Sequence, residues 1–442
     1  MDVTGRDNSV TREVTGAEIH ALASRIFPIC RSITGQGVRD TLAILREHIP
    51  LTSVDIASGT RVYDWTVPDE WIVRDAYIRA PSGEKVVDFA RSNLHLMNYS
   101  VPVRKVMPLY ELKSHIHTLP EQPDVIPYKT AYYTDAWGFC MSHAQFRRLP
   151  EQHYDIVIDT EKRPGALTYG EYLHRGESSR EVLFYAHICH PSLANDNCSG
   201  LATLTLLAAA LRGRKTHYSY RFVFAPGTIG SLSWLSRNED RLSNIAAGLV
   251  VSCIGDDGGP HYKQSRRGDA MIDRILPAIR CGDEEKPVGI APFTPYGYDE
   301  RQFCSPGFNL PVGLLQRSKF GSFPEYHTSA DNLDFITPKA LGQSFRMLSD
   351  IVEVLERNAI PLNLSPKGEP QLGRYGLFPA IGGHKTNSQR TMAYLWLLNM
   401  ADGTCSLLDI AEKSGLSFAE ISAAADALCD AGLLASHGFC RC

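Results

Sequence analysis

The second half of the chain alternates between short apolar runs and longer helical segments. Residues 181–186 (EVLFYA) and 220–225 (YRFVFA) are short and apolar, which is typical of strands buried on both faces of a sheet. Between them, residues 200–212 (GLATLTLLAAALR) predict a helix, and further strands are predicted at 246–254 and 310–316. The pattern predicts an α/β sheet with crossover helices, in which ligands bind at the carboxyl ends of the strands.

The part of the chain before these strands follows another pattern. Residues 17–49 predict two helices, because apolar residues recur at helical spacing on both sides of a turn at Gly35 and Gly37. Residues 56–158 are dense in aromatic residues and proline, contain short strand-like runs and show no long helical period. We interpret 56–158 as a β-rich domain inserted into the α/β domain; a loop-rich stretch of the same domain is the alternative.

From about Tyr375 the sequence predicts a separate helical domain. A helix is expected around residues 390–400, and the amphipathic segments 406–415 and 417–434 join at a glycine as a helix-turn-helix. Residues 432–441 are expected to form a short hairpin after it. Together these elements are the pattern of a winged helix.

The charge of the chain argues against nucleic acid as a partner. Lys and Arg number 45 against 49 Asp and Glu, and the net charge is −4. In residues 375–442 four basic side chains stand against six acidic ones, and the second helix of the motif has neither Lys nor Arg. Because phosphate contacts supply most non-specific DNA affinity, we predict that this domain binds a protein partner or a second copy of the chain.

No segment approaches the roughly 18 uninterrupted apolar residues of a membrane span, so no membrane association is expected. The polar first residues lack the basic-then-apolar pattern of a signal peptide. The 11 cysteines are scattered without the spacing of a disulfide-stapled scaffold. We therefore expect a cytoplasmic protein with reduced thiols.

Two motifs carry the candidate chemistry. HICHPSLANDNCSG follows the first strand of the sheet and places His187 and Asp196 ahead of a helix N-terminus. FPEYHTSADN places His327 and nearby carboxylates in a loop after a later strand. Imidazole and carboxylate are groups that bind Zn²⁺. Either motif alone is more often structural, but two of them after buried strands favour a metal site.

These motifs also carry a resemblance to known proteins. AHICHPSLANDNCSG and EYHTSADNLDFI resemble the zinc aminopeptidase superfamily, whose fold is a mixed α/β sheet with helices on both faces. The full layout, with YDWTVPDEW, AYYTDAWGFC and YDERQFCSPGFNLP, is similar to bacterial aminopeptidase-like proteins with an inserted β-rich domain and a C-terminal winged helix. The expected domains are therefore 1–55 with 159–360 (aminopeptidase-like), 56–158 (β-rich insert) and 375–442 (winged helix).

The resemblance implies roles for single residues. His187 matches the first zinc ligand, Asp196 matches the carboxylate that bridges both ions in two-zinc members, and His327 matches the last histidine ligand. Asp299 stands where relatives carry an acidic residue near the site. This implies a carboxylate that orients a ligand or contacts the substrate.

The chain departs from the superfamily pattern at three places. Residues 225–228 (APGT) stand where the pattern has two glutamates, one a general base and one a ligand. Ser252 and Cys253 replace the next carboxylate ligand, and Cys189 replaces an aspartate two residues after His187. A two-zinc site is therefore incomplete, and we predict one zinc ion with three protein ligands and an open position for water.

Without that glutamate, the general base has to be another group. Glu325 is the first candidate, because it lies two residues before the histidine of the second motif, and Glu300 and Asp256 follow. A structural role for Glu325 is the alternative. Three roles are open for His190. It stabilises an oxyanion as a catalytic group, it binds the zinc ion, or it hydrogen-bonds the backbone.

Other residues are candidates for binding the substrate. Arg301 is a possible clamp for a carboxylate or a phosphate, as are Arg266 and Arg267, although most such arginines are solvated surface groups. Aromatic residues of the insert are expected to line the pocket or to fill the core of their domain: Tyr132, Tyr133 and Trp137.

Several functions agree with these features. The first is a zinc-dependent hydrolase of amide bonds in a small molecule such as a biosynthetic intermediate, in which zinc polarises the carbonyl and a carboxylate moves the proton. A close variant is an acyl-transferring or cyclising zinc enzyme, because FPEYHT is similar to a stretch of the glutaminyl cyclases. A non-catalytic metal-binding scaffold is favoured by the missing glutamates. The last candidate function is a transcription regulator, and the charge of residues 375–442 argues against it.

Overall fold

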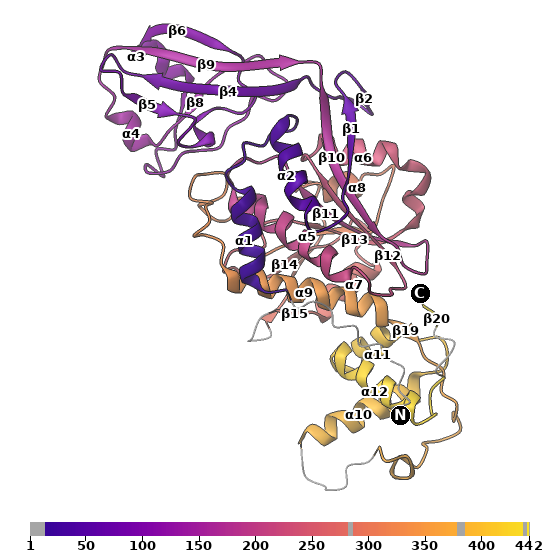
Figure 1. Cartoon of the computed structure of the whole chain (residues 1–442). Coiled ribbons are helices and arrows are strands. Elements are labelled where there is room, and N and C mark those ends of the chain that lie inside the picture. Colours follow the sequence, from indigo (N-terminus) through magenta and orange to yellow (C-terminus); the bar gives the residue numbers. More distant parts are fainter. Residues whose placement is uncertain (1–13, 282–285, 378–384, 436–439, 442) are drawn as a thin grey trace. The chain divides into compact units, whose positions relative to one another are not determined.

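The computed structural model describes residues 14–281, 286–377, 385–435 and 440–441 (Figure 1). The chain forms two compact units, Met1–Asp273 with Cys281–Arg346, and Arg274–Arg280 with Met347–Cys442. The predicted α/β sheet and the β-rich segment both belong to the first unit. The predicted winged helix belongs to the second.

The centre of the first unit is a mixed sheet of eight strands among the described residues, in the order β1-β10-β12-β11-β13-β18-β14-β17. Strands β12, β11, β13 and β18 are parallel, and every residue in them is buried, as their apolar sequences predict. The bounds are β1 (Thr52–Ala57), β10 (Ala166–His174), β11 (Glu181–His187), β12 (Ser219–Ala225), β13 (Ile245–Val251), β14 (His261–Lys263), β17 (Gly289–Ala291) and β18 (Val312–Gln316).

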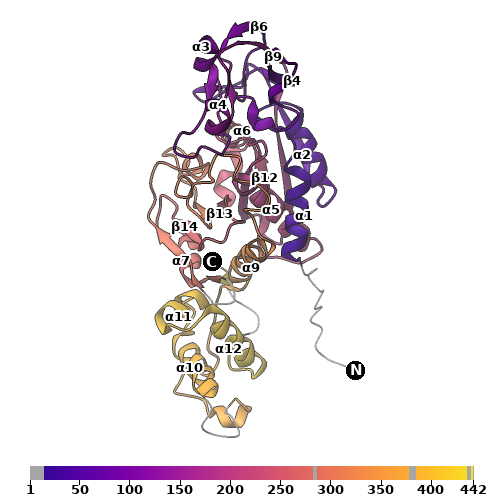
Figure 2. The ribbon, with the colours of Figure 1, turned by 90° about the vertical axis from the view of Figure 1, so that its left-hand side faces the viewer.

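Helices cover both faces of this sheet (Figure 2). On β10, the Cα of Gly170 faces Leu42 of α2, while Glu171 accepts a hydrogen bond from Trp234 of α6. Because neighbouring residues of a strand point to opposite faces, α2 and α6 lie on opposite sides. The bounds are α1 (Gly16–Ile26), α2 (Gln36–Arg46), α5 (Gly200–Leu211), α6 (Ile229–Arg237), α7 (Met271–Ala278), α8 (Glu300–Phe303) and α9 (Pro338–Arg357).

Local sequence signals set the first two helices. Thr15 and Glu18 form a reciprocal capping box at the start of α1. Gly35 precedes α2 with a φ of 103°, and a Cβ at this position would lie 2.7 Å from the carbonyl oxygen of Trp71. The predicted turn is therefore at Gly35, whereas Gly37 already belongs to α2.

The segment between β1 and β10 is β-rich, as expected. Its main sheet has the order β5-β4-β9-β6, and two short pairs, β2/β3 and β7/β8, accompany it. The predicted insert limits, residues 56 and 158, fall within β1 and β9, so the insert as a separate domain stays a prediction. The bounds are β2 (Arg61–Val62), β3 (Trp65–Thr66), β4 (Glu70–Arg79), β5 (Lys85–Asp88), β6 (Val103–Pro108), α3 (Leu109–Leu112), β7 (Ile116–His117), β8 (Phe139–Cys140), α4 (His143–Arg147) and β9 (His153–Arg163).

One apolar core joins this β-rich segment to the α/β sheet. Trp71 and Tyr99 of the segment belong to the same cluster of buried residues as Leu183 of β11 and Val250 of β13. The ring of Trp71 stacks on that of Tyr99. Burial of these large side chains therefore holds the segment against the sheet.

The second unit has the helix-turn-helix that the sequence predicts. Capping boxes at Ser406 and Ser417 begin α11 (Leu407–Ser414) and α12 (Phe418–Asp430), and Gly415 ends α11 with a φ of 71°. The remaining bounds are β19 (Ala359–Ile360), α10 (Lys385–Met400) and β20 (Cys440–Arg441).

The predicted hairpin at 432–441 is described only at its two ends. Residues 436–439 lie outside the described residues, and the rest of the segment pairs with a strand-like stretch that precedes α10. Leu364 N donates to Leu433 O, and β20 pairs with β19. The wing is therefore closed by distant residues of the chain.

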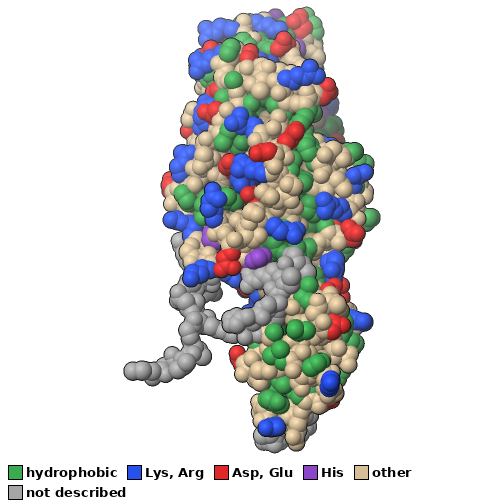
Figure 3. Space-filling view, turned by 90° about the vertical axis from the view of Figure 1, so that its right-hand side faces the viewer, with side chains coloured by type: hydrophobic (Ala, Val, Ile, Leu, Met, Phe, Trp, Pro, Cys, Tyr) green, Lys and Arg blue, Asp and Glu red, His purple; other side chains and the backbone are tan. Residues whose placement is uncertain are grey.

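The described helices include none that combines the length and the apolar character of a membrane span. On the face in Figure 3, Lys and Arg side chains are interspersed with Asp and Glu, and no continuous basic patch covers the winged-helix unit.

Candidate metal centre

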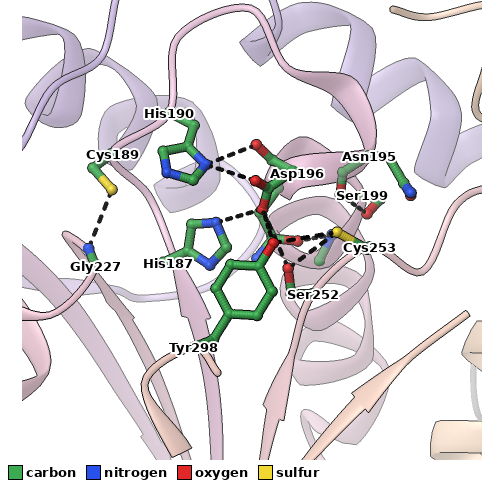
Figure 4. A network of polar contacts seen from close by, with 12 residues as sticks. His187, Cys189, His190, Asn195, Asp196, Ser199, Gly227, Ser252, Cys253 and Tyr298 are labelled. Carbon is green, nitrogen blue, oxygen red and sulfur yellow. Dashed lines mark hydrogen bonds and ion pairs between the residues drawn. The ribbon is translucent and has the colours of Figure 1, made fainter. Parts of the chain in front are cut away.

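The first motif begins where a central strand ends. His187 is the last residue of β11, and Asp196 lies in the turn Ala194–Ser199 that leads into α5 (Figure 4). The exposed fractions of His187 and Asp196 are 1% and 0%. His187 Nε2 lies 2.8 Å from Asp196 Oδ1. The strand end and the turn thus hold a buried imidazole against a buried carboxylate.

Polar contacts hold the turn around Asp196. Asn195 Nδ2 donates to Asp256 Oδ2 at 2.8 Å, and Gly255 N donates to Asn195 Oδ1 at 2.8 Å. The two carboxylate oxygens of Asp331 accept the backbone N–H groups of Asn195 (2.5 Å) and Asp196 (3.0 Å). Asp331 belongs to the second motif, so both motifs support the position of Asp196.

Three imidazoles converge on the carboxylate of Asp196. Besides His187, His190 Nδ1 lies 3.0 Å from Asp196 Oδ2, and His327 Nε2 lies 2.9 Å from the same oxygen. The ring centroids of His190 and His187 are 4.7 Å apart, and those of His190 and His327 are 5.0 Å apart. The fold therefore brings together the three residues predicted as ligands, and His190 joins them.

The residues fit a zinc ion. Among the described residues, the ligand atoms of His187, His190 and Asp196 all lie within 4.8 Å of one another. Both ring nitrogens of His187 are buried, and beyond the 2.8 Å contact of Nε2 with Asp196 Oδ1 neither has a partner in the described structure. An unsatisfied buried nitrogen is costly, and coordination of a cation would satisfy it.

Charge complementarity within this cluster shifts the protonation of its members. Burial alone would raise the pKa of Asp196, but the imidazoles of His190 and His187 lower it well below its ordinary value. Burial alone would lower the pKa of His190, but Asp196 raises it. Burial lowers the pKa of His327 against the pull of Asp196. Asp196 is therefore an ionised carboxylate, the form that binds metals.

The predicted general bases lie outside this cluster. Glu300 is fully buried and pairs with Lys263, and burial raises the pKa of Glu300 although the Lys263 ammonium opposes the shift. Asp256 is tied to Asn195. Glu325, Glu300 and Asp256 are all absent from the described residues that line the pocket of the three imidazoles. Glu300 is thus placed as a structural ion pair, because its carboxylate is sealed from the pocket.

Asp299 is the carboxylate that the fold brings to the pocket. It precedes α8, is 2% exposed and lines the pocket with the three imidazoles. Asp299 Oδ1 accepts hydrogen bonds from Thr228 N (2.9 Å) and Ser231 Oγ (2.6 Å). A Cβ on Gly227 would lie 3.8 Å from Asp299 Oδ2. Asp299 therefore reaches the space next to the segment 225–228, where the superfamily pattern has its glutamates.

Tyr298 is a site residue that the sequence analysis missed. Its hydroxyl donates to Asp196 Oδ1 at 2.9 Å and lies 3.6 Å from Cys253 Sγ, while its ring stacks on His187 with centroids 4.9 Å apart. Ser252 Oγ also donates to Asp196 Oδ1, at 3.3 Å. The sequence offered one signal that could have identified it, namely the position of Tyr298 directly before the candidate residue Asp299. Here hydroxyl donors occupy one side of the Asp196 carboxylate.

The three imidazoles line a pocket of about 330 Å³. Trp65, Tyr132 and Tyr133 of the β-rich segment form part of its wall, as predicted for the two tyrosines. Trp137 is not among the lining residues, and its ring instead stacks on His115 at 3.5 Å between centroids. The volume suits a small molecule or the end of a peptide.

Tyr128 is a second residue that the sequence did not reveal. Its ring meets His190 and His327 edge-on, with centroids 5.3 and 5.2 Å apart, and its N–H donates to His327 O. These contacts bind the β-rich segment to the second motif. The loop around Tyr128 therefore helps to position His327.

Comparison with solved structures identifies the class of fold. BSAP, a zinc aminopeptidase from Bacillus subtilis, matches with a TM-score of 0.55 at 12% identity, over 76% of this chain and 94% of that chain. An aminopeptidase from Aneurinibacillus sp. strain AM-1 matches with a TM-score of 0.51 at 11% identity, over 78% of this chain and 95% of that chain. The chain has the zinc aminopeptidase fold, which confirms the predicted mixed sheet with helices on both faces.

Comparison with protein families is more specific. A family model described as a domain of unknown function, DUF4910, matches residues 20–358, and a winged helix-turn-helix model matches residues 359–436. The chain therefore belongs to the DUF4910 family and carries a winged-helix domain. The predicted combination of an aminopeptidase-like domain and a winged helix is confirmed.

A named protein and a crystal structure, both from Clostridium acetobutylicum, match this chain over almost their whole length. One protein, named for polysaccharide biosynthesis and for an aminopeptidase-like domain, is 52% identical over 416 residues, which cover 94% of this chain and 95% of the relative. A crystal structure described as that of a peptidase has a TM-score of 0.90 at 50% identity, over 95% of this chain and 96% of that chain.

Proposed function

We propose that this protein is a zinc-dependent hydrolase of amide bonds in small molecules. The observation that carries the proposal is the convergence of three imidazoles on the ionised, buried carboxylate of Asp196 in a pocket of small-molecule size. The zinc aminopeptidase fold supports it, because amide hydrolysis is the activity that this class name describes.

His187, His190 and Asp196 would hold one zinc ion, because their ligand atoms meet the mutual distance of a metal site. A zinc ion bound there supplies a Lewis acid for the scissile carbonyl and lowers the pKa of water. His327 would orient Asp196 through its bond to Oδ2. This set differs from the one implied by the resemblance, in which His327 is a ligand and His190 is not.

Asp299 would accept the proton of the attacking water and return it to the leaving amine. Its Oδ1 atom is held by two donors, which leaves Oδ2 toward the space beside Gly227. Tyr298 and Ser252 would keep Asp196 in place by donating to Oδ1.

The natural substrate would be an intermediate of a biosynthetic pathway. The support is the name of the Clostridium acetobutylicum relative, which refers to polysaccharide biosynthesis. Amide-bearing groups of small biosynthetic molecules are within the size of the pocket.

The test is turnover of a panel of N-acyl and aminoacyl amides by zinc-loaded protein, with Asp196→Asn as the inactive variant. Asp124→Asn is the matched control, because Asp124 is exposed and distant in the sequence from both motifs. We expect turnover by the wild type and by the control, and none by Asp196→Asn. Retained turnover in Asp196→Asn would overturn the proposal.

Two results would favour the other predicted functions. Bound zinc without turnover of any amide would support a metal-binding scaffold, which the absence of glutamate at residues 225–228 favours. Products in which an added amine, or the amine of the substrate itself, replaces water would support acyl transfer or cyclisation.

A further inference from the structure

Arg301 stands out among the residues that line the pocket. It belongs to α8, two residues after Asp299, and its side chain is partly buried. Among the described residues that line the pocket, Arg301 is the only lysine or arginine. A permanent positive charge is therefore present in the same pocket as the candidate metal centre.

This guanidinium has no partner in the described structure. Arg301 Nε is buried without a hydrogen-bond partner, and no described carboxylate lies within 4.0 Å of the side chain's nitrogens. Desolvating a guanidinium without a partner is unfavourable. An arginine with this environment is typical of a site that a ligand completes.

Four other buried cations of the first unit have partners within the fold, although Nε of Arg317 is itself unpaired while its other two nitrogens donate to Ala340 O and Gln343 Oε1. Arg221 binds Glu181 through Nε at 2.5 Å and through a second nitrogen at 2.8 Å. Lys263 pairs with Glu300. Arg31 donates to His190 O at 2.9 Å. Arg301 differs from these cations because none of its side-chain nitrogens has a partner in the described structure.

The neighbouring acidic residues do not neutralise Arg301. Asp299 directs Oδ1 to Thr228 N and Ser231 Oγ, and Glu300 points away to Lys263. The three consecutive charged residues of the sequence YDER therefore have three different environments. Of these three residues, only Arg301 lines the pocket without a counter-charge in the described structure.

Aromatic rings surround the rest of the pocket, and several of them are open to solvent. Tyr296 is 72% exposed, Tyr133 is 50% exposed and Trp65 is 38% exposed, although all three line the pocket. Such exposed rings bind the flat or apolar body of a ligand. The lining therefore combines a ring-binding wall with one cation.

We propose that Arg301 binds an anionic group of the substrate, so that the enzyme acts on small amides that carry both a ring and a carboxylate or phosphate. The inference rests on the proposed amide hydrolysis for the identity of the reacting bond. It adds the class of substrate, which the fold does not specify. The guanidinium would form two parallel hydrogen bonds to the anion and orient the amide toward Asp299 and the three imidazoles.

The test uses N-benzoylglycine, which contains a ring, an amide bond and a carboxylate, and its neutral counterpart N-benzoylglycinamide. Binding is measured by isothermal titration calorimetry with the full chain, both as purified and after zinc loading, for the wild type, Arg301→Met and Arg301→Lys. Arg148→Met is the matched control, because Arg148 is exposed and is not among the described residues that line the pocket. Thermal unfolding establishes that each variant is folded.

We expect the wild type and Arg148→Met to bind the anion at least tenfold more tightly than the neutral amide. Arg301→Met should lose this preference, and Arg301→Lys should keep part of it, because it retains the charge but not the fork of donors. Equal binding of both compounds by the wild type, an unchanged preference in Arg301→Met, or no binding of the anion would each overturn the inference.

Turnover separates this inference from the proposed function. If the preference depends on Arg301 but no amide of either charge is hydrolysed, the anion site stands and the hydrolase proposal fails. If neutral amides are hydrolysed as fast as anionic ones, and Arg301→Met hydrolyses both normally, the hydrolase proposal stands and the anion site fails.

Discussion

The carboxylate of Asp331 holds the backbone of Asp196, 135 residues away in the chain, through a hydrogen bond of 3.0 Å from Asp196 N to Asp331 Oδ2. The other oxygen accepts the N–H of Asn195. Both residues of the pair are fully buried. A carboxylate that accepts two backbone donors fixes the direction from which the Asp196 side chain enters the site.

Asp331→Asn should therefore weaken zinc binding although Asp331 is not a proposed ligand. An amide group replaces one acceptor by a donor, which would face a backbone N–H and displace the turn. We expect zinc affinity to fall about 10- to 100-fold, as for other outer partners of metal ligands. Competition with a chelator of known affinity measures the change. Asp334→Asn, an exposed aspartate of the same segment, should bind zinc normally.

Substitution of the four cluster residues should sort ligands from their supports. His187→Ala, His190→Ala and Asp196→Asn should each lower zinc affinity by more than about 100-fold, whereas His327→Ala should cost about 10-fold. Bound zinc after gel filtration, measured by elemental analysis, is the readout. His153→Ala, at an exposed histidine, is the control.

The assignment of ligands would change if His327→Ala lost more zinc than His190→Ala. Loss of zinc in His327→Ala with retention in His190→Ala would show that the ligand set implied by the resemblance is right. Retention in all four variants would remove the metal centre altogether.

The elements predicted well from the sequence are those whose apolar residues leave one choice of structure. Strands β11, β12 and β13 are buried along their whole length, so short apolar runs identify them. Strand β10 has a mixed burial pattern, and β14 and β17 have only three residues each. Their pairing depends on neighbours that are distant in the sequence, so no local pattern predicts these strands.

The residues of the site also differ in how well the sequence predicts them. Histidine and aspartate after buried strands were visible as ligand types, whereas Tyr298 and Tyr128 reach the cluster only because distant segments pack together. Proximity in the sequence suggested Glu325 as the base, and the geometry of the pocket suggests Asp299 instead. Glu325 lies two residues from His327 but does not line the pocket, while Asp299 is brought there by α8.

Asp299→Asn should abolish most of the amide hydrolysis that we propose. An amide cannot accept the proton, so we expect kcat to fall about 10²- to 10⁴-fold with little change in bound zinc. Glu325→Gln is the comparison, because it was the base expected from the sequence, and should keep normal kcat. Steady-state kinetics with the best amide of the panel measures both. A large loss in Glu325→Gln with normal activity in Asp299→Asn would reverse the assignment.

The stability of the protein should fall in mild acid partly because of His117. Burial, with smaller effects of the charges of Lys129 and His115, lowers the pKa of His117 from 6.5 to about 4. Between these values the unfolded chain binds the proton and the folded chain does not, so stability is full above pH 6.5 and falls as the pH approaches 4.

Because the ring of His117 is partly exposed, solvent screening reduces this contribution to about 1–2 kcal/mol. Urea unfolding at pH 7 and pH 4.5 should show that His117→Gln loses less stability on acidification than the wild type. His153→Gln is the control at an exposed histidine and should behave as the wild type. An equal loss in His117→Gln and in the wild type would contradict the role of His117.

The full chain should not bind duplex DNA despite its winged helix. Helix α12 has the sequence FAEISAAADALCD, which offers three acidic side chains and no basic one to a phosphate backbone. Two nearby arginines of the second unit are engaged, since Arg357 pairs with Asp426 and Arg274 binds Asp409 at 2.6 Å. Fluorescence anisotropy with a labelled duplex should stay flat up to about 100 μM protein at both 50 and 200 mM salt, because no phosphates are neutralised. An affinity that falls steeply between these salt concentrations would show phosphate contacts and would return the winged helix to a role on nucleic acid.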